Sequence, residues 1–356
     1  MSNPSAKPLL CLENVRLSFQ TYAGEVKALD GITLEVLRGE VLGLVGESGC
    51  GKSVTALTIV RVLPENATVT SGRILLSDKN LLETNPEEMR QVRANNIAMV
   101  FQDPTTFLNP VLTIGDQLEE VFLLNPERLA RIAVERRIGT IQDSHEASLR
   151  NLSRAHQRKL AEVLSIEVLR KVRLPDPERI LDNYPHELSG GMRQRCMIAM
   201  ALARNPDLFI ADEITTALDV TIQAQILELL RELKREIAGS TLLITHDLGV
   251  VAELCDRVAV MYAGNIVELA DVEELFANPL HPYTQGLLRA IPIIGRPLKR
   301  LETIRGSVPD LIYPPSGCRF HPRCPMALER CKVEKPELIQ SVKNHTVACH
   351  LYDGNA

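Results

Sequence analysis

The chain has 356 residues, which is enough for two domains or for one domain with an appendage. Its hydrophobic content of 45% is ordinary for a globular protein, and its formal net charge of −5 gives no general reason to expect nucleic-acid binding. No apolar run approaches the ~18 residues of a membrane-spanning helix, and the opening MSNPSAKPLL lacks the long apolar region of a secretory signal. We therefore expect a soluble cytoplasmic chain, or one held at a membrane by other chains.

Three stretches near the N-terminus are typical of antiparallel strands. Apolar and polar residues alternate over residues 12–19 and 32–37, and residues 72–76 continue the pattern. Such alternation indicates strands with one buried and one solvent-exposed face. We predict a small antiparallel β subdomain here.

The glycine-rich segment GESGCGKS, at residues 46–53, is typical of a phosphate-binding loop. It follows an apolar run at residues 41–45, which indicates a buried strand, and it precedes a helical pattern over residues 53–62. In this setting backbone N–H groups line the phosphates, Lys52 reaches the β- and γ-phosphates, and the Ser53 hydroxyl binds magnesium. The candidate nucleotide-binding residues of this segment are Gly46, Ser48, Gly49, Cys50, Gly51, Lys52, Ser53 and Val54.

The pattern becomes helical from about residue 113 to residue 172, where residues such as Ile114 and Leu118 recur at helical spacing. Residues 125–158 are rich in Arg, Glu, Gln and Ser. We interpret them as solvated, charged helices, with a contact to a specific partner as the alternative. The sequence predicts an inserted α-helical subdomain at about residues 103–188.

A second Gly-Gly turn stands in LSGGMRQ, at residues 188–194, where a predicted helix over residues 192–203 begins. Ser189 is placed either to cap this helix or to bond a γ-phosphate, and Gly190 and Gly191 let the backbone approach a phosphate closely. The phosphate loop already holds the chain's own nucleotide. We therefore expect this second turn to bind the ATP of another chain.

Two later strands end in polar residues. The run LFIADE, at residues 208–213, turns acidic at Asp212 and Glu213, where open parallel sheets place their ligands. Asp212 suits magnesium binding through water and Glu213 suits activation of the attacking water, with a pair of solvated loop acids as the alternative. Residues 241–245 form another apolar strand, which is followed by His246.

The order of these motifs resembles that of the ATP-binding cassette (ABC) ATPases. The resemblance implies an α/β fold with a P-loop NTPase (RecA-like) core, an antiparallel β subdomain and an inserted α-helical subdomain. In this family two ATPase subunits enclose nucleotides between the phosphate loop of one and the signature turn of the other. Because LSGGMRQ matches the signature turn, the resemblance implies that Ser189, Gly190 and Gly191 contact the partner's ATP.

The resemblance also implies roles for residues outside these motifs. Gln102, in VFQDP, matches the glutamine loop, which senses magnesium and the γ-phosphate. His246 matches the histidine that contacts the γ-phosphate and fixes the water. Asp219, with Ala217 and Leu218 before it, matches the loop that crosses the dimer and couples the two sites.

Adenine recognition and the catalytic strand end complete the comparison with this family. An aromatic residue before the first strand pair is expected to stack on adenine, and Tyr22 fits this spacing best, with Phe19 as the alternative. The chain has Ile214 where the family usually has proline after the catalytic glutamate. Both Asp212 and Glu213 are retained, so the resemblance still implies hydrolysis.

From residue 278 onward the chain becomes rich in proline, as in NPLHPYTQGLL and PPSGCRFHPRCP. These segments resemble the C-terminal extension of bacterial ABC importers for peptides, dipeptides and nickel. We therefore expect an ATPase domain at residues 1–275 and an extension at residues 276–356. The resemblance covers essentially the whole chain and is strongest to the first of two paired ATPase subunits in a dipeptide or oligopeptide permease.

This resemblance implies a function and a set of partners. The chain would bind and hydrolyse ATP with magnesium to power import of di- or oligopeptides, with nickel or an oligosaccharide as alternative cargo. The implied partners are a second homologous ATPase subunit, two membrane permease subunits and an extracytoplasmic solute-binding protein, without nucleic acid. The chain would lie peripherally on the cytoplasmic face of the cell inner membrane. A non-transport ABC ATPase is the alternative from another class, and the single phosphate loop and acidic net charge disfavour it.

Four of the eight cysteines lie in the extension, at Cys318, Cys324, Cys331 and Cys349. Disulfides are disfavoured in a cytoplasmic chain, and thiolates suit zinc or an iron–sulfur cluster, but the spacing alone does not decide between them. The resemblance implies a 4Fe-4S cluster, with zinc or unligated thiols as the alternatives. Such a cluster would staple the Pro-rich extension or sense redox state. Cys50 lies inside the phosphate loop, where we expect thiol reagents to modify it and to prevent ATP binding.

Overall fold

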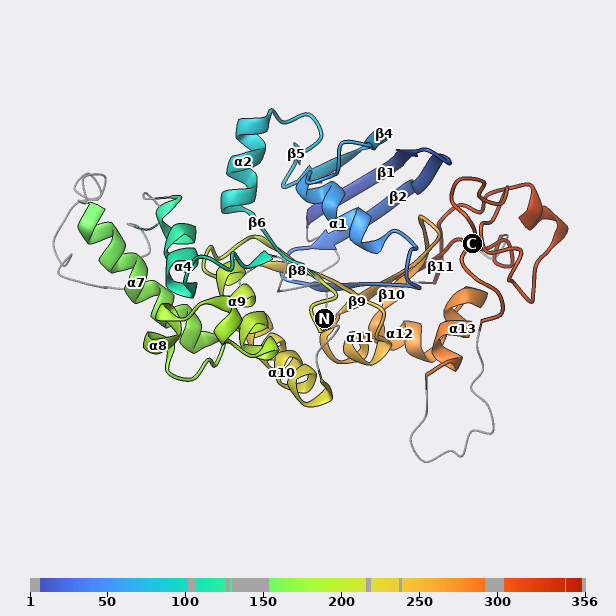
Figure 1. Cartoon of the computed structure of the whole chain (residues 1–356). Helices are drawn as coiled ribbons and strands as arrows, with labels where there is room; N and C mark the ends of the chain where they lie inside the picture. The colour runs from blue at the N-terminus through green and yellow to red at the C-terminus, as the bar shows by residue number, and fades with distance from the viewer. Residues whose placement is uncertain are drawn as a thin grey trace. The chain divides into compact units, whose positions relative to one another are not determined.

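The computed structural model describes residues 7–101, 107–125, 129, 154–215, 219–236, 239–291, 304–342 and 344–353, without the side chains of residues 233, 235 and 236. The chain divides into two compact units (Figure 1). The first combines Met1–Met89 with Ser240–Ala356, and the second is Arg90–Gly239. The boundary expected at residue 275 falls inside the first unit, so the extension folds together with the phosphate-loop segment.

The first unit contains the antiparallel β subdomain that the alternation predicts. Its strands lie in the order β2-β1-β4-β5. Leu10, Leu12 and Leu17 of β1 are buried, whereas Arg16 is exposed, so one face of the sheet packs and the other is solvated. The strands are β1 (Pro8–Thr21), β2 (Gly24–Leu37), β4 (Ala67–Leu76) and β5 (Lys79–Asn80).

A second sheet of the first unit has the order β11-β12-β10-β9-β3-β8. β3 pairs in parallel with both β8 and β9, and all five of its residues are buried, as expected for a central parallel strand. β12 pairs with β10 and β11 pairs with β12, so the C-terminal extension adds strands to the sheet that carries the phosphate loop. The strands are β3 (Val41–Val45), β8 (Ser240–Thr245), β9 (Arg257–Tyr262), β10 (Asn265–Asp271), β11 (Ile339–Val342) and β12 (His345–Val347).

Short helices complete the first unit. Their bounds are α1 (Lys52–Val60), α11 (Leu248–Leu254), α12 (Val272–Ala277), α13 (Pro282–Arg289) and the 3₁₀ helix η2 (Glu329–Lys332). α1 confirms the helix predicted after the phosphate loop. Among the described residues beyond 278, no helix is longer than α13, in agreement with the proline content of the extension.

The second unit is largely helical, as the sequence predicts. α4, α7, α8 and α9 pack against one another (Figure 1), and β6 and β7 pair in parallel. The Thr113 hydroxyl and the Asp116 carboxylate form a capping box at the start of α4. The elements are α4 (Ile114–Leu123), α7 (Arg154–Lys171), α8 (Pro177–Asp182), the 3₁₀ helix η1 (Pro185–Glu187), α9 (Gly190–Leu202), α10 (Val220–Glu236), β6 (Ile97–Val100) and β7 (Leu208–Asp212), and α2 (Pro86–Asn95) leads into the unit.

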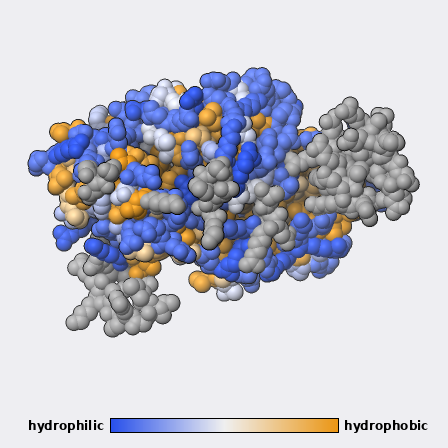
Figure 2. Space-filling view, turned by 180° about the vertical axis from the view of Figure 1, so that it is seen from behind, coloured by the Kyte–Doolittle hydropathy of each residue, from blue (hydrophilic) through white to orange (hydrophobic). Residues whose placement is uncertain are grey.

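The surface is mainly hydrophilic, with separate apolar areas, on the face that Figure 2 shows. Within the described part of the chain, none of the helices combines the length and the apolar character needed to cross a bilayer. Most of residues 125–158 lie outside the described residues, so the interpretation of that segment remains a prediction.

Candidate functional site

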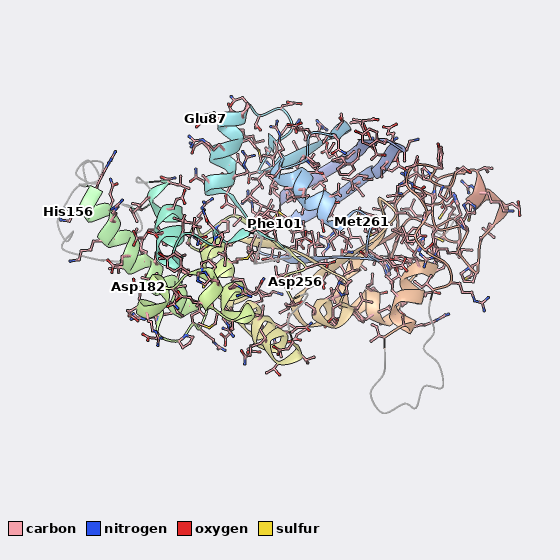
Figure 3. The ribbon with its side chains drawn as sticks, in the orientation of Figure 1. Glu87, Phe101, His156, Asp182, Asp256 and Met261 are labelled. Carbon is pink, nitrogen blue, oxygen red and sulfur yellow. The ribbon has the colours of Figure 1, made fainter. Side chains whose placement is uncertain are left out.

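The phosphate loop follows β3, and its glycines have backbone conformations that other residues rarely adopt. Gly46, Gly49 and Gly51 have φ values of 156°, 79° and 110°. A Cβ on Gly46 would lie 2.2 Å from the carbonyl oxygen of Met261, a residue of β9 that Figure 3 labels. A Cβ on Gly51 would lie 2.7 Å from the Met261 methyl group, whereas one on Gly49 would meet nothing within 4 Å. The close packing of Met261 of β9 against Gly46 and Gly51 therefore constrains the path of the loop.

Lys52 begins α1, directly after the N-cap residue Gly51. Its ammonium group donates hydrogen bonds to the carbonyl oxygens of Gly46 at 2.8 Å and Glu47 at 3.1 Å. Because these carbonyls belong to the phosphate loop, the Lys52 ammonium group is held at the loop, next to the N-terminus of α1. A helix N-terminus is a favourable place for a phosphate group. Ser53 follows as the second residue of the same helix, as the motif predicts.

Cys50 of the phosphate loop is buried, which bears on the prediction that thiol reagents modify it. Its side chain is 0% exposed, and burial raises the pKa of the thiol. A protonated, buried sulfur is a poor nucleophile, because thiol reagents react with the exposed thiolate. Burial therefore disfavours the modification that the motif predicts, because the motif alone does not reveal that the Cys50 side chain is buried.

His246 lies beside the phosphate loop in the first unit. β8 runs parallel to β3, and Val45 is the register partner of Thr245. Gly46 and His246, the next residues of the two strands, therefore leave the same edge of the sheet. His246 is exposed, and the following residue, Asp247, caps α11 by accepting a hydrogen bond from the Gly249 N–H at 2.8 Å.

The acidic strand end lies in the second unit. Asp212 closes β7 and is buried, and Glu213 turns away from the strand with a left-handed φ of 47°. Ile214, which replaces the usual proline, is 2% exposed and packs in the core. Val100 is the register partner of Ala211, so the segment leading to Gln102 leaves the sheet beside Asp212. Gln102 itself lies outside the described residues.

The signature turn is also in the second unit, at the start of α9. The Ser189 hydroxyl accepts a hydrogen bond from the Met192 N–H at 3.3 Å and thereby caps the helix. A Cβ on Gly190 would meet nothing within 4 Å, whereas one on Gly191 would lie 2.7 Å from Ile222 of α10. Gly191 is therefore required for packing, and Gly190 leaves its backbone open to approach.

Asp219 and Tyr22 both lie within the described residues. The Asp219 carboxylate accepts a hydrogen bond from the Ile222 N–H at 2.9 Å at the start of α10. Ala217 and Leu218 lie outside the described residues. Tyr22 is fully exposed in the turn between β1 and β2, whereas Phe19 is half-buried.

Two segments of the chain match known protein families. Residues 29–216 match the family described as ABC transporter. The chain belongs to the ABC transporter ATP-binding proteins. Residues 267–331 of this ABC protein match a second family, described as the oligopeptide/dipeptide transporter C-terminal region. The resemblance that the motifs carry is therefore confirmed in both parts of the chain.

Similar proteins support the same membership over nearly the full length. The chain is 48% identical to the probable peptide ABC transporter ATP-binding protein y4tR of Sinorhizobium fredii, over 98% of this chain and 96% of that protein. It is 46% identical to the dipeptide transport ATP-binding protein DppD of Bacillus subtilis, with the same coverage. The fold is similar to that of the ATP-binding cassette MJ0796, solved as a dimer with ADP and Pi, at 25% identity and a TM-score of 0.58 over 74% of this chain and 98% of that one. The P-loop NTPase fold is thus confirmed.

Sequence reasoning missed the contacts that the C-terminal region of this ABC protein makes with the phosphate loop. The Glu47 N–H donates a hydrogen bond to the Tyr283 hydroxyl at 2.8 Å, and Arg323 forms an ion pair with the Glu47 carboxylate at 2.6 Å. Tyr283 belongs to HPYT and Arg323 to HPRCP, the two segments on which the resemblance to the extension rests. The presence of these two segments was the available signal in the sequence, but it did not reveal that Tyr283 and Arg323 contact Glu47.

The four cysteines of the extension lie close enough to influence one another. Burial, followed by the charges of Cys318, Cys324 and Cys331, raises the pKa of Cys349 to about 12. The Cys318 N–H donates a hydrogen bond to the Cys331 carbonyl at 2.9 Å, and none of the four forms a disulfide. Within the ranges that the structure describes, no three His, Cys, Asp or Glu side chains are arranged to hold a single metal ion.

Proposed function

We propose that this chain is the ATP-binding and ATP-hydrolysing subunit that powers import of di- or oligopeptides through an ABC transporter. One observation carries the proposal. The stretch that matches the oligopeptide/dipeptide transporter C-terminal region begins within β10, and β10 pairs with β9 of the sheet that holds the phosphate loop, so the two parts act as one folded unit. A peptide-transport region built into the ATPase core favours a dedicated transport subunit over a cassette with another task.

Within this function, the residues of the first unit bind the nucleotide phosphates. The loop N–H groups and the Lys52 ammonium neutralise phosphate charge, and His246 contacts the γ-phosphate from the neighbouring strand. Ser53, Gln102 and Asp212 supply the oxygen donors that magnesium prefers, and they would hold it. Bound magnesium neutralises charge on the β- and γ-phosphates.

The second unit supplies the base and the partner contact. Glu213 orients the attacking water and accepts its proton. Gln102 contacts magnesium and the γ-phosphate and so responds to bound ATP. Ser189, Gly190 and Gly191 close over the ATP of a second ATPase subunit, and Asp219 couples the two sites. Tyr22 stacks on adenine, in keeping with its full exposure. Closure on two ATP molecules and release after hydrolysis would move two permease subunits between inward- and outward-facing states.

The cysteines of the extension bind a 4Fe-4S cluster in this proposal. Four free thiols within electrostatic reach of one another are a donor set that suits iron and sulfide. Zinc, which a set of thiolates also suits, is the lesser alternative, because the resemblance to the importer family implies a cluster. The cluster staples an extension that has little core of its own, and a redox-sensing role is compatible with the same ligands.

The proposal is tested by purifying the tagged chain from its own membranes in mild detergent and identifying the associated proteins by mass spectrometry. A second ATPase, two permeases and a solute-binding protein are expected, with the chain on the cytoplasmic face of the inner membrane. Recovery of a binding protein specific for nickel or for oligosaccharides would show that one of these, and not a peptide, is the cargo. Recovery with ribosomal or DNA-repair proteins and no permease would overturn the transport function.

A further inference from the structure

Glu47, the second residue of GESGCGKS, is held at both its side chain and its backbone by residues of the C-terminal region. Its carboxylate accepts two hydrogen bonds from the Arg323 guanidinium, at 2.6 Å and 3.0 Å. Its N–H group donates to the Tyr283 hydroxyl at 2.8 Å. A bidentate pair fixes orientation as well as distance, because both guanidinium nitrogens must face both carboxylate oxygens.

The Arg323 side chain is itself fixed in place. It is only 6% exposed, its Nε donates a hydrogen bond to the Arg305 carbonyl at 2.9 Å, and its guanidinium lies 5.7 Å from the centre of the Tyr262 ring. The hydrogen bonds to Glu47 raise the pKa of Arg323, so the charge is retained at every accessible pH. A buried, multiply bonded arginine cannot follow Glu47 if the loop shifts.

Tyr283 is equally constrained. It is 0% exposed, and its ring contacts Tyr262 edge-on at 4.7 Å and Phe320 at 5.4 Å. Its own N–H donates to the His281 ring at 3.0 Å, which fixes the start of α13. The phosphate loop therefore rests on an aromatic cluster to which β9, α13 and the segment before Arg323 contribute.

The position of Glu47 is transmitted to the phosphate-binding groups. The Glu47 carbonyl oxygen accepts hydrogen bonds from the Lys52 ammonium at 3.1 Å and from the Cys50 N–H at 3.3 Å. A displacement of Glu47 would therefore move the carbonyl that orients Lys52 and would change the curvature of the loop. The motif needs no particular residue at this position for phosphate chemistry, since its side chain points to Arg323.

We propose that Arg323 and Tyr283 are positioning residues for the phosphate loop, through which the C-terminal region sets the affinity of the subunit for the phosphates of ATP. The inference rests on ATP binding by the proposed function. Neither residue touches the nucleotide in this proposal. Both act by holding Glu47, and the effect is on nucleotide affinity rather than on the chemical step.

The chain offers a matched control at the other end of β3. Glu40 precedes the strand and pairs with Arg257 at 3.3 Å, with side-chain exposures of 8% and 18%. This pair is also an Arg–Glu bridge of the first unit, but it lies where β3 begins, whereas Glu47 lies beyond the end of the strand. Arg257→Gln should therefore weaken the fold without altering the loop.

The experiment measures the dissociation constants of ATP and ADP for the purified full chain, together with KM and kcat for hydrolysis and the melting temperature. Arg323→Gln should raise the ATP and ADP dissociation constants about 10-fold, as loss of hydrogen bonds to a charged group implies. KM should rise similarly while kcat changes little. Arg257→Gln should leave the ATP and ADP dissociation constants within about twofold of the wild-type values, although its melting temperature should fall about as much as that of Arg323→Gln.

Two further variants cover the case in which Arg323→Gln does not fold. Arg323→Lys keeps the charge but loses the bidentate geometry, and Tyr283→Phe removes only the hydroxyl group. Both substitutions should weaken ATP binding. The double variant Arg323→Gln/Glu47→Gln should bind ATP no more weakly than either single variant, because the two side chains act through the same contact. Unchanged ATP affinity in variants that fold would overturn the inference, whereas failure of the wild-type chain to bind ATP would overturn the proposed function instead.

Discussion

The backbone N–H of His281 donates a hydrogen bond to the Glu268 carboxylate at 2.9 Å, and both side chains are buried. The same carboxylate accepts from the Leu280 N–H at 2.7 Å and lies 2.7 Å from the His345 ring. Glu268 of β10 thus joins the start of α13 to β12. It fixes the segment from which Tyr283 reaches the phosphate loop.

Stability should decrease in mild acid because of His281. Burial lowers the pKa of His281 to about 4, although Glu268 opposes the shift. The unfolded chain, with a pKa near 6.5 for this residue, binds the proton more readily, so the contribution is complete above about pH 6.5 and is lost as the pH falls towards 4. We expect His281 to account for a loss of about 2 kcal/mol in the free energy of unfolding between pH 7 and pH 5.

Urea unfolding at several pH values measures this loss. His281→Asn is the matched control, because an asparagine oxygen can still cap α13 by accepting from the Tyr283 N–H but does not titrate. The variant should show a flatter dependence on pH than the wild-type chain. Equal slopes for the two proteins would show that other groups dominate.

Two glycines of the phosphate loop should respond differently to alanine. Gly46→Ala places a Cβ 2.2 Å from a backbone carbonyl that cannot rotate away, whereas Gly49→Ala adds only the strain of a positive φ. We expect Gly46→Ala to lower the free energy of unfolding by about 3 kcal/mol or more, and Gly49→Ala by about 1 kcal/mol. Chemical denaturation compares them directly, and similar losses would mean that β9 does not constrain the loop.

Glu213→Gln should separate ATP binding from hydrolysis. The substitution preserves the size of the side chain but removes the base, so turnover should fall ~10²–10⁴-fold. ATP should remain bound with nearly unchanged affinity, because Lys52 and the loop are untouched. Steady-state hydrolysis and direct ATP titration provide the two measurements, and near-normal turnover would refute the role of Glu213.

The extension should carry iron when the protein is purified without oxygen. We expect a brown protein with iron and sulfide, and loss of both in Cys318→Ser and Cys349→Ser. Cys196→Ser is the matched control, because this thiol is 0% exposed and lies in α9 of the second unit. A colourless protein without iron, with all four cysteines intact, would exclude the cluster.

The sequence by itself determined the fold class and located the candidate catalytic groups. GESGCGKS, LSGGMRQ and LFIADE are local patterns in which spacing alone places a residue at a helix start or a strand end, so Lys52, Ser189 and Asp212 could be located without coordinates. Periodicity likewise predicted the antiparallel sheet and the helical insertion. Local interactions decide these features, and a short segment contains all the information.

Only the tertiary structure decided how the C-terminal region meets the phosphate loop. Glu47 and Arg323 are 276 positions apart, and Arg323 also packs on Tyr262, which contacts Tyr283 and Phe320 in the aromatic cluster. Burial of Cys50 depends in the same way on elements distant in the sequence. A linear pattern does not specify which distant side chains become neighbours, because that outcome follows from the packing of the whole unit.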